Sequence, residues 1–313
     1  MKILFMGTPD IAATCLSALI EEGFELVGAV CQPDKPKGRG YTLTPPPVKV
    51  CAMAHGIPVY QPQTLKDGAF ASTLAELAPE AIAVVAYGKI LPSYLIRYPK
   101  YGCVNVHASL LPKYRGAAPM QRAIMEGEKE TGVTTMLMDE GLDTGDMLLQ
   151  RAFPIEPEDN FETVHDKTAA LGATMLCETL RGLEAGALRP IPQGEGATYA
   201  AKITKEDCAL DFSLSARVLS QRVRGLSPIP LSYTKTPDGK LLKVVSAYEE
   251  AASHHGTPGQ ILALSDGGEG AIRVACGEGV LVITSVLPEG KGKMSAAAFI
   301  RGRKVALGDL LSL

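Results

Sequence analysis

Several features that would assign this chain to a familiar class of protein are absent from it. None of its apolar runs approaches the roughly 18 residues that cross a bilayer. The opening stretch, MKILFMGTPD, carries one Lys and runs directly into a strand pattern, unlike a signal or transit peptide. The seven cysteines show no Cys-x-x-Cys spacing, and a scattered odd number is typical of reduced thiols. We therefore expect a cytoplasmic protein without a disulfide framework.

The motifs of three common kinds of active site are also missing. The turn after the first strand, residues 7–10, has only one of the glycines of a dinucleotide-binding fingerprint, which argues against a dehydrogenase. We interpret it as a tight strand-to-helix turn capped by Thr8. There is no Gly-x-Ser-x-Gly elbow, and no spacing of His, Cys and carboxylate residues predicts a metal site.

The composition supports a large core, and the charges are unevenly distributed. The chain has 313 residues, of which 46% are hydrophobic, enough for one large domain or two ordinary ones. Residues 1–207 hold 19 Lys and Arg against 25 Asp and Glu, whereas residues 208–313 hold 12 against 9. A basic C-terminal part indicates a polyanionic partner only weakly, because so small an excess of charge often has no function.

The order of apolar patterns predicts an α/β protein. Strand-like runs alternate with helical stretches in the first half, which favours a Rossmann-like, doubly wound, mostly parallel sheet. A long amphipathic helix follows at 161–185, and Gly and Pro then break the pattern. After Cys208, one helical stretch precedes short strands separated by turns, as in a small OB-like β-barrel. We predict a first domain over 1–189, a linker over 190–207 and a second domain over 208–313.

Residues 32–50, QPDKPKGRGYTLTPPPVKV, form a long and basic predicted loop. It carries Lys35, Lys37, Arg39 and Lys49 among five prolines and two glycines. Proline restricts the backbone while the cations offer phosphate contacts, so the loop has the composition of a semi-rigid basic finger. A solvated surface loop explains the same composition equally well, and composition alone leaves both interpretations open.

The most unusual polar residues follow a strand pattern at 102–108. Asn105 and His107 are two positions apart and would lie on one face of the strand, at the edge where parallel sheets bind ligands. Asp143, in a glycine-flanked turn, supplies the carboxylate that an acid–base imidazole normally needs. An amide, an imidazole and a carboxylate without a nucleophile suit an oxyanion site at which the substrate itself attacks an acyl carbon. A structural polar network at a strand end is an equally weighted alternative.

Two long segments, NVHASLLPKYRGAAP (105–119) and GVTTMLMDEGLDTGDML (132–148), resemble the folate-dependent formyltransferases. The resemblance implies that Asn105, His107 and Asp143 are the catalytic set. It also implies 10-formyltetrahydrofolate as co-substrate, with no metal and no covalent enzyme intermediate. Two segments match the family's folate-binding parts, and the residues concerned are Ser109, Leu110, Leu111 and Pro112 in one, and Val85, Tyr87, Gly88 and Ile90 in the other.

The basic stretch indicates which of the family's acceptors this chain would use. QPDKPKGRG resembles the insertion loop of the members that formylate initiator methionyl-tRNA, which implies tRNA reading by Arg39 and phosphate contacts by Lys35 and Lys37. Members that formylate nucleotide-linked amino sugars are the main alternative, and a catalytically idle tRNA-binding protein is another. The second domain argues against the single-domain glycinamide ribonucleotide enzymes.

Further contacts to tRNA would come from the basic C-terminal domain, by charge and not by base reading. Its candidate residues are Arg222, Arg224, Lys240, Lys243, Lys291, Lys293, Arg301, Arg303 and Lys304. Most lysines and arginines are simply solvated, so the sequence does not decide among them. We expect a monomer, because no pattern indicates a dimer interface.

Overall fold

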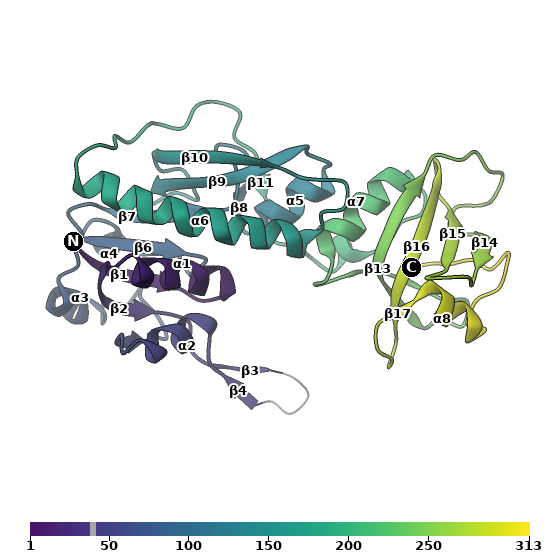
Figure 1. Ribbon diagram of the computed structural model, residues 1–313, viewed down its shortest axis with the longest axis horizontal. Coiled ribbons are helices and arrows are strands. Elements are labelled where there is room, and N and C mark those ends of the chain that lie inside the picture. Colours follow the sequence, from purple (N-terminus) through teal and green to yellow (C-terminus); the bar gives the residue numbers. More distant parts are fainter. Residues whose placement is uncertain (38–41) are drawn as a thin grey trace. The chain divides into compact units, whose positions relative to one another are not determined.

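The computed structural model describes residues 1–37 and 42–313, which divide into two compact units (Figure 1). Unit 1 consists of Met1–Gly116, Thr131–Phe153 and His165–Ala200. Unit 2 consists of Ala117–Glu130, Pro154–Val164 and Ala201–Leu313. The domain boundaries expected from the sequence stay a prediction.

Unit 1 is built on a seven-stranded sheet in the order β10-β9-β7-β6-β1-β2-β5. Its strands are β1 (Lys2–Gly7), β2 (Glu25–Val30), β5 (Val59–Tyr60), β6 (Ala81–Val85), β7 (Cys103–His107), β9 (Glu130–Leu137) and β10 (Met147–Pro154). The neighbours from β7 through β6, β1 and β2 to β5 are parallel, and β7 and β9 are antiparallel. The predicted mostly parallel sheet is therefore confirmed.

Helices cover both faces of this sheet, because β6 and residues 3–6 of β1 are apolar and buried at successive positions, which point to opposite faces. The helices of the unit are α1 (Asp10–Glu21), α2 (Pro47–Ala54), α3 (Ala71–Leu77), α4 (Ser93–Ile96) and α6 (Phe161–Glu184). Ile3 and Phe5 belong to a core cluster with α1 and α6, whereas Leu4 and Met6 belong to one with α3 and α4 (Figure 1). Each fully buried side chain of this size contributes roughly 1.5–3 kcal/mol.

The turn between β1 and α1 differs from its prediction in one detail. Helix α1 is preceded by Pro9 and has no side-chain cap, so the predicted capping role of Thr8 is wrong. The Thr8 hydroxyl instead donates to the carbonyl oxygen of Tyr87, at 3.0 Å. A Cβ on Gly7 would lie 2.6 Å from the Cβ of Ala12 and 2.8 Å from the Val85 oxygen, so this position requires glycine for close helix–strand packing.

The basic stretch at 32–50 contains more regular structure than the sequence predicts. Strands β3 (Lys35–Lys37) and β4 (Thr42–Thr44) pair antiparallel, and α2 begins at Pro47, where the missing N–H of proline costs no helix bond. Arg39, to which the resemblance assigns tRNA reading, lies outside the described residues.

A charged cluster closes the base of this β3–β4 hairpin. The Lys49 ammonium donates to both carboxylate oxygens of Asp34, at 2.9 and 2.8 Å, and to Gln61 Oε1 at 2.9 Å. The Gln61 amide nitrogen donates to Asp34 Oδ1 at 2.7 Å and to the Gln32 carbonyl oxygen at 2.9 Å. Lys49 is therefore engaged by the protein, and the phosphate contact that its position in the basic stretch suggested is unsupported.

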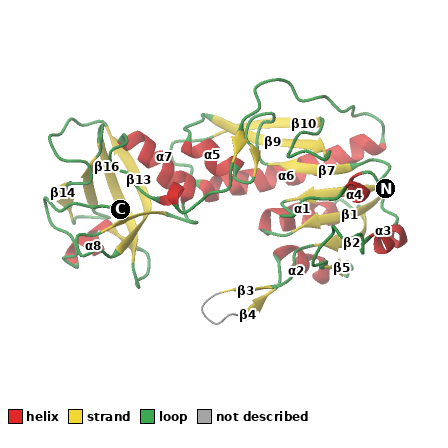
Figure 2. Cartoon of the chain, turned by 180° about the vertical axis from the view of Figure 1, so that it is seen from behind, coloured by secondary structure: helices red, strands yellow, loops and turns green. Residues whose placement is uncertain are grey.

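Unit 2 contains an antiparallel sheet of six strands. The strands are β12 (Ser232–Lys235), β13 (Leu241–Glu250), β14 (Ile261–Ser265), β15 (Ala271–Ala275), β16 (Val280–Pro288) and β17 (Met294–Ser295). They are accompanied by α5 (Pro119–Met125), the 3₁₀ helix η1 (Glu206–Cys208), α7 (Ala216–Leu226) and α8 (Ala296–Arg301). One apolar cluster from α7, α8 and the sheet forms its core (Figure 2).

The last residues of the chain bond to both outer strands of this sheet. Ser312 exchanges two backbone hydrogen bonds with Lys235 at the end of β12. The Leu311 N–H donates to the Gly259 oxygen, and the Asp309 oxygen accepts from Ile261 at the start of β14. Because one segment pairs with both edges, the sheet closes, which confirms the predicted small barrel. Within the described ranges, no helix is long and apolar enough to cross a membrane.

Substitutions of two adjacent leucines test whether this closing segment stabilises unit 2. Leu311 is 2% exposed and belongs to the core of unit 2, whereas Leu310 is 49% exposed. We predict that Leu311→Ala lowers the free energy of unfolding by about 2–5 kcal/mol, because it removes buried methyl groups and leaves a cavity. Leu310→Ala, the matched control, should cost less than about 1 kcal/mol. Urea unfolding measures both, and equal losses would contradict this account.

The cluster at the hairpin base predicts a shifted titration. Hydrogen bonds from Lys49 and then Gln61 hold the pKa of the Asp34 carboxyl below its ordinary value. The ionised carboxylate therefore stabilises the fold above that ordinary value, and this stability is lost as the pH falls through the lowered pKa. We predict that Lys49→Met raises the pKa of Asp34 in a carboxyl NMR titration. Lys66→Met, at an exposed lysine, is the control; an unchanged Asp34 titration in Lys49→Met would show that Lys49 does not set it.

Candidate functional site

The expected catalytic residues lie where β7 ends beside β6 and β9. Asn105 is opposite Val84 of β6, and His107 is opposite Thr134 of β9. Val104 and Val106 pack into the core shared with α1 and α6, so the alternating side chains of Asn105 and His107 lie on the other face of the strand. The sheet therefore presents an amide and an imidazole side by side at one edge.

The imidazole of His107 is buried and oriented by the backbone. Only 5% of the residue is exposed, and its Nε2 lies 2.9 Å from the carbonyl oxygen of Tyr114. A carbonyl only accepts hydrogen bonds, so Nε2 must carry a proton. The other nitrogen, Nδ1, lies 3.7 Å from Oδ2 of Asp143. A second proton on the ring would thus lie between the imidazole and a carboxylate.

Asp143 reaches the imidazole from the turn between β9 and β10. Its φ is +53°, in the left-handed region, and its Oδ2 accepts a hydrogen bond of 2.8 Å from the backbone N–H of Gly116. Gly116 belongs to the short strand β8 (Arg115–Gly116), where an added Cβ would lie 2.8 Å from the Ala200 oxygen. The structure therefore brings Asp143 close to His107, which lies 36 positions earlier in the chain and two positions after Asn105.

Asn105 differs from its neighbours in having an unused amide. Its side chain is half-buried, and within residues 1–37 and 42–313 it makes no hydrogen bond to the protein. An amide N–H at such a position can be offered to a bound oxygen without breaking an existing contact.

The expected folate-binding turn after β7 is anchored to the neighbouring strands. Buried Ser109 donates through Oγ to the Lys113 oxygen at 2.6 Å, and its own carbonyl accepts from Thr134 Oγ1 at 2.7 Å. The Leu111 N–H donates to that same threonine oxygen at 3.1 Å, and Gln150 donates to the Leu111 oxygen at 2.8 Å. The turn is thus fixed on β9 and β10, with Leu110 and Pro112 half-buried.

The second expected folate segment follows β6 at the same edge of the sheet. Val85 ends β6 and is buried, and the carbonyl oxygen of Tyr87 accepts from Thr8 and from the Gln32 side chain. Gly88 has a φ of +85°, and the side chain of Ile90 is 76% exposed. Burial raises the pKa of the Tyr87 hydroxyl to about 12, which keeps it neutral. Parallel pairing of β6 and β7 brings both expected folate segments to one side of the site.

One residue near the site, Gln193, carried no signal in the sequence. Gln193 donates through its amide to the carbonyl oxygens of Asp143 and Gly145, and it accepts from the guanidinium of Arg115. The partners of Gln193 are 48 to 78 positions away in the chain. No local pattern marks such a residue, and only the folded chain reveals it.

The basic residues expected to contact tRNA lie in the hairpin stretch of unit 1 and in unit 2. Lys35 is exposed at the start of β3, and Lys37 is the last residue of that strand. In unit 2, the cations that already have a partner in the protein are Arg222, Arg224, Lys240, Lys243 and Arg301. For the described parts of the chain, no side-chain partner is found for the remaining exposed candidates, Lys291, Lys293, Arg303 and Lys304.

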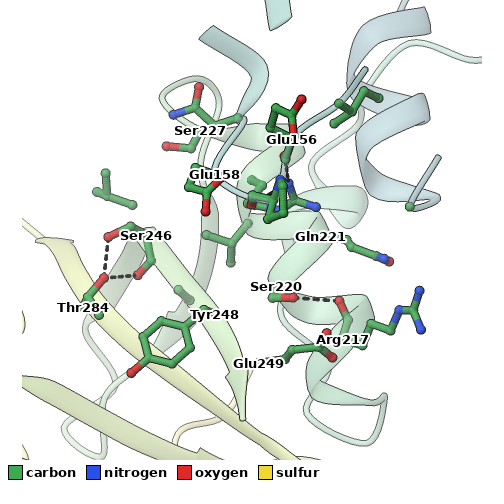
Figure 3. Close-up of a pocket in the computed structure, with 18 of the residues that line it drawn as sticks. Glu156, Glu158, Arg217, Ser220, Gln221, Ser227, Ser246, Tyr248, Glu249 and Thr284 are labelled. Carbon is green, nitrogen blue, oxygen red and sulfur yellow. Dashed lines mark hydrogen bonds between the residues drawn. The ribbon is translucent and has the colours of Figure 1, made fainter. Parts of the chain in front are cut away.

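One of these candidates, Arg224, lines a cavity of about 590 Å³ in unit 2 (Figure 3). It lies between α7, β13 and residues 155–160, and its rim includes Arg217, Tyr248 and the hydrogen-bonded pair Ser246 and Thr284. Its glutamates are Glu128, Glu156, Glu158 and Glu249. These four carboxyl groups outnumber the cavity's cations, Lys129, Arg217 and Arg224, so the charge of its lining does not favour a phosphate backbone. Among the described residues, no cluster of three or more His, Cys, Asp or Glu is arranged to hold a metal ion.

Comparisons with known proteins identify the family of the chain. The family model described as "Formyl transferase" matches residues 1–180, and "Formyl transferase, C-terminal domain" matches residues 202–304. A methionyl-tRNA formyltransferase of Citrifermentans bemidjiense is 49% identical, over 99% of this chain and 96% of that protein. Another from Myxococcus xanthus is 48% identical, over 98% of this chain and 97% of that protein.

Solved structures share the fold at lower identity. An N-formyltransferase of Helicobacter canadensis, in complex with folinic acid and dTDP-3-aminofucose, has a TM-score of 0.67 at 17% identity, over 90% of this chain and 98% of that one. HypX of Aquifex aeolicus, in complex with tetrahydrofolic acid, has a TM-score of 0.66 at 21% identity over 96% of this chain, which spans about half (47%) of HypX. The two family models and the full-length relatives together show that this chain belongs to the formyl transferase family.

Proposed function

We propose that this protein transfers the formyl group of 10-formyltetrahydrofolate to the free amino group of methionyl initiator tRNA. The observation that carries the proposal is similarity along the whole chain to relatives named methionyl-tRNA formyltransferase, at 45–49% identity. The side-chain chemistry at the end of β7 supports the same reaction, because it offers oxyanion donors and a proton relay without a protein nucleophile.

In this proposal the amino group of the charged methionine attacks the formyl carbon of the bound folate. A C–N bond forms to the amine, and the formyl oxygen gains negative charge in the tetrahedral intermediate. The free amide of Asn105 donates to that oxygen, and one such donor contributes about 3 kcal/mol of barrier lowering in other enzymes. When it carries a second proton, the His107 ring is the other donor through Nδ1, because Nε2 already donates to the Tyr114 carbonyl oxygen. The 3.7 Å between Nδ1 and Asp143 Oδ2 is too long for a hydrogen bond and leaves that N–H for the formyl oxygen.

The intermediate collapses when the bond between the formyl carbon and N10 of the folate breaks. The attacking nitrogen must lose a proton, and N10 must gain one, so the reaction is balanced by a proton transfer between the two. Asp143, which lies 3.7 Å from the ring through Oδ2, stabilises the imidazolium and assists that transfer through an ordered water. No covalent bond to the enzyme is formed at any step.

The two substrates would bind on different parts of the chain. We propose that the donor contacts the turn Ser109, Leu110, Leu111 and Pro112 and the segment with Val85, Tyr87, Gly88 and Ile90. For the tRNA we propose contacts with Lys35 and Lys37 of β3, with Arg39 and with the basic side chains of unit 2. The proposed acceptor, a cytoplasmic molecule, places the reaction in the cytoplasm, and we propose a monomer.

Formylation of a nucleotide-linked amino sugar is the second candidate function. Two solved structures favour it, an N-formyltransferase in complex with dTDP-3-aminofucose and a sugar 3N-formyl transferase, but both are less than 25% identical to this chain and show the fold alone. The β3–β4 hairpin, with exposed Lys35 at its start, favours a polyanionic acceptor over a single nucleotide sugar.

The catalytic role of His107 is tested by His107→Ala. We predict that turnover falls by a factor on the order of 10²–10⁴, because the variant loses both the oxyanion donor and the proton relay. The affinity for tRNA should stay close to that of the wild type, since the imidazole is buried at the donor side of the site. Single-turnover formylation and filter binding measure the two effects. His255→Ala, at an exposed histidine of unit 2, is the control, and a near wild-type rate in His107→Ala would refute the role.

The hairpin contact is tested by Lys35→Ala and its salt dependence. Each phosphate contact releases about one counterion, so removing one should weaken tRNA binding and reduce the slope of log K against log salt by about 1. Lys66→Ala removes an exposed lysine elsewhere in unit 1 and should leave both quantities unchanged. If Lys35→Ala has the affinity and slope of the wild type, the hairpin base does not contact tRNA through this residue.

A further inference from the structure

The side-chain amide of Gln193 is fully used by contacts around the Asp143 turn. Its Nε2 donates to the carbonyl oxygens of Asp143 and Gly145, both at 2.8 Å. Its Oε1 accepts from Nε of Arg115 at 3.1 Å and from Nη2 at 2.6 Å. Carbonyls only accept and a guanidinium only donates, so these partners allow a single orientation of the amide.

The turn that Gln193 holds needs external support. Asp143 has a φ of +53°, a left-handed conformation that a residue other than glycine keeps only where its surroundings enforce it. Gly145 packs so closely on β9 that an added Cβ would overlap the carbonyl oxygen of Leu137. Since the turn is strained at one residue and tightly packed at another, its position depends on the hydrogen bonds that fix its carbonyls.

The side chain and the backbone of Asp143 are both hydrogen-bonded to the same short strand, β8, the first directly and the second through Gln193. Its carboxylate accepts from the N–H of Gly116, and its carbonyl is bonded through Gln193 to the adjacent Arg115. Strand β8 therefore holds the side chain directly and the backbone through Gln193. The distance between Asp143 and His107 depends on both connections, because one holds the carboxylate and the other holds the backbone from which the side chain extends.

Gln193 is itself anchored on both sides along the chain. Ile191 exchanges two backbone hydrogen bonds of 2.8 Å with Met147, just after the turn. Further on, β11 (Tyr199–Ala200) pairs parallel with β8 (Arg115–Gly116). The segment from 191 to 200, which the sequence suggested to be part of a linker, thus lies hydrogen-bonded against the site.

We propose that Gln193 is a positioning residue that sets the place of the Asp143 carboxylate relative to His107. It touches no substrate in this account and acts only through the turn. The kinetic part of the proposal rests on the proposed formyl transfer, whereas its structural part does not.

The first test is Gln193→Leu, whose apolar and shorter side chain removes all four hydrogen bonds. We expect kcat to fall by a factor on the order of 10–100, because a shift of about 1 Å in a catalytic group has effects of that size. The KM values for donor and tRNA should change by less than about threefold. Gln193→Asn is the milder variant: it is one methylene too short to reach both Arg115 and the turn, and its kcat should fall by a smaller factor. Glu195→Leu, at an exposed position of the same segment, is the control.

A double-mutant cycle separates positioning from general destabilisation. If Gln193 acts only through Asp143, then Gln193→Leu should produce no further loss of kcat in an Asp143→Ala background. A further loss of the full single-mutant size would overturn the proposal, as would a wild-type kcat in both Gln193 variants. A rise in KM with kcat unchanged would also overturn it, because Gln193 would then contribute to binding.

Hydrogen–deuterium exchange tests the structural part without any substrate. Amides within residues 139–146 should exchange at least several-fold faster in Gln193→Asn than in the wild type, with β1 and β6 unchanged. Unchanged exchange in the turn would overturn the proposal. Failure of the wild type to formylate methionyl-tRNA would instead count against the proposed function, and the kinetic comparison would then use whichever acceptor the wild type formylates.

Discussion

The hydrogen bond from the Gly116 N–H to the Asp143 carboxylate joins two parts of the chain that the reaction requires together. One part is the turn after β7, which begins at His107 and carries the expected donor-binding residues. The other is the turn after β9, which supplies the carboxylate. Without this bond the imidazole would lack its acidic partner, and the edge of the sheet would offer only isolated polar side chains.

The remaining structure serves to hold this contact and to bring two unlike substrates to it. The parallel pairing of β6 and β7 places both candidate folate segments beside Asn105, whose amide is unused within the described chain. The hairpin extends from the same unit and is fixed at its base by Lys49 and Asp34. In unit 2, the closed barrel depends on the last residues of the chain, which bond to both of its outer strands.

Much of this arrangement is local enough to be predicted from the sequence. The alternation at 102–108 correctly predicts the strand and the common face of Asn105 and His107, and the glycine-flanked turn identifies Asp143. Gln193 could not be found in this way, because its partners are distant in sequence and glutamine has no distinctive spacing. For the same reason the pairing of Lys49 with Asp34 is invisible in composition, where a lysine in a basic stretch resembles a phosphate contact.

The central claim is the identity of the acceptor, and a competition assay tests it most directly. The wild-type protein would be given labelled 10-formyltetrahydrofolate with charged initiator methionyl-tRNA and a nucleotide-linked amino sugar together. The account predicts that label moves to the tRNA alone. Label on the sugar would keep the chemistry of Asn105, His107 and Asp143 but contradict the proposed acceptor, and label on neither would contradict the assignment as a formyl-transferring enzyme.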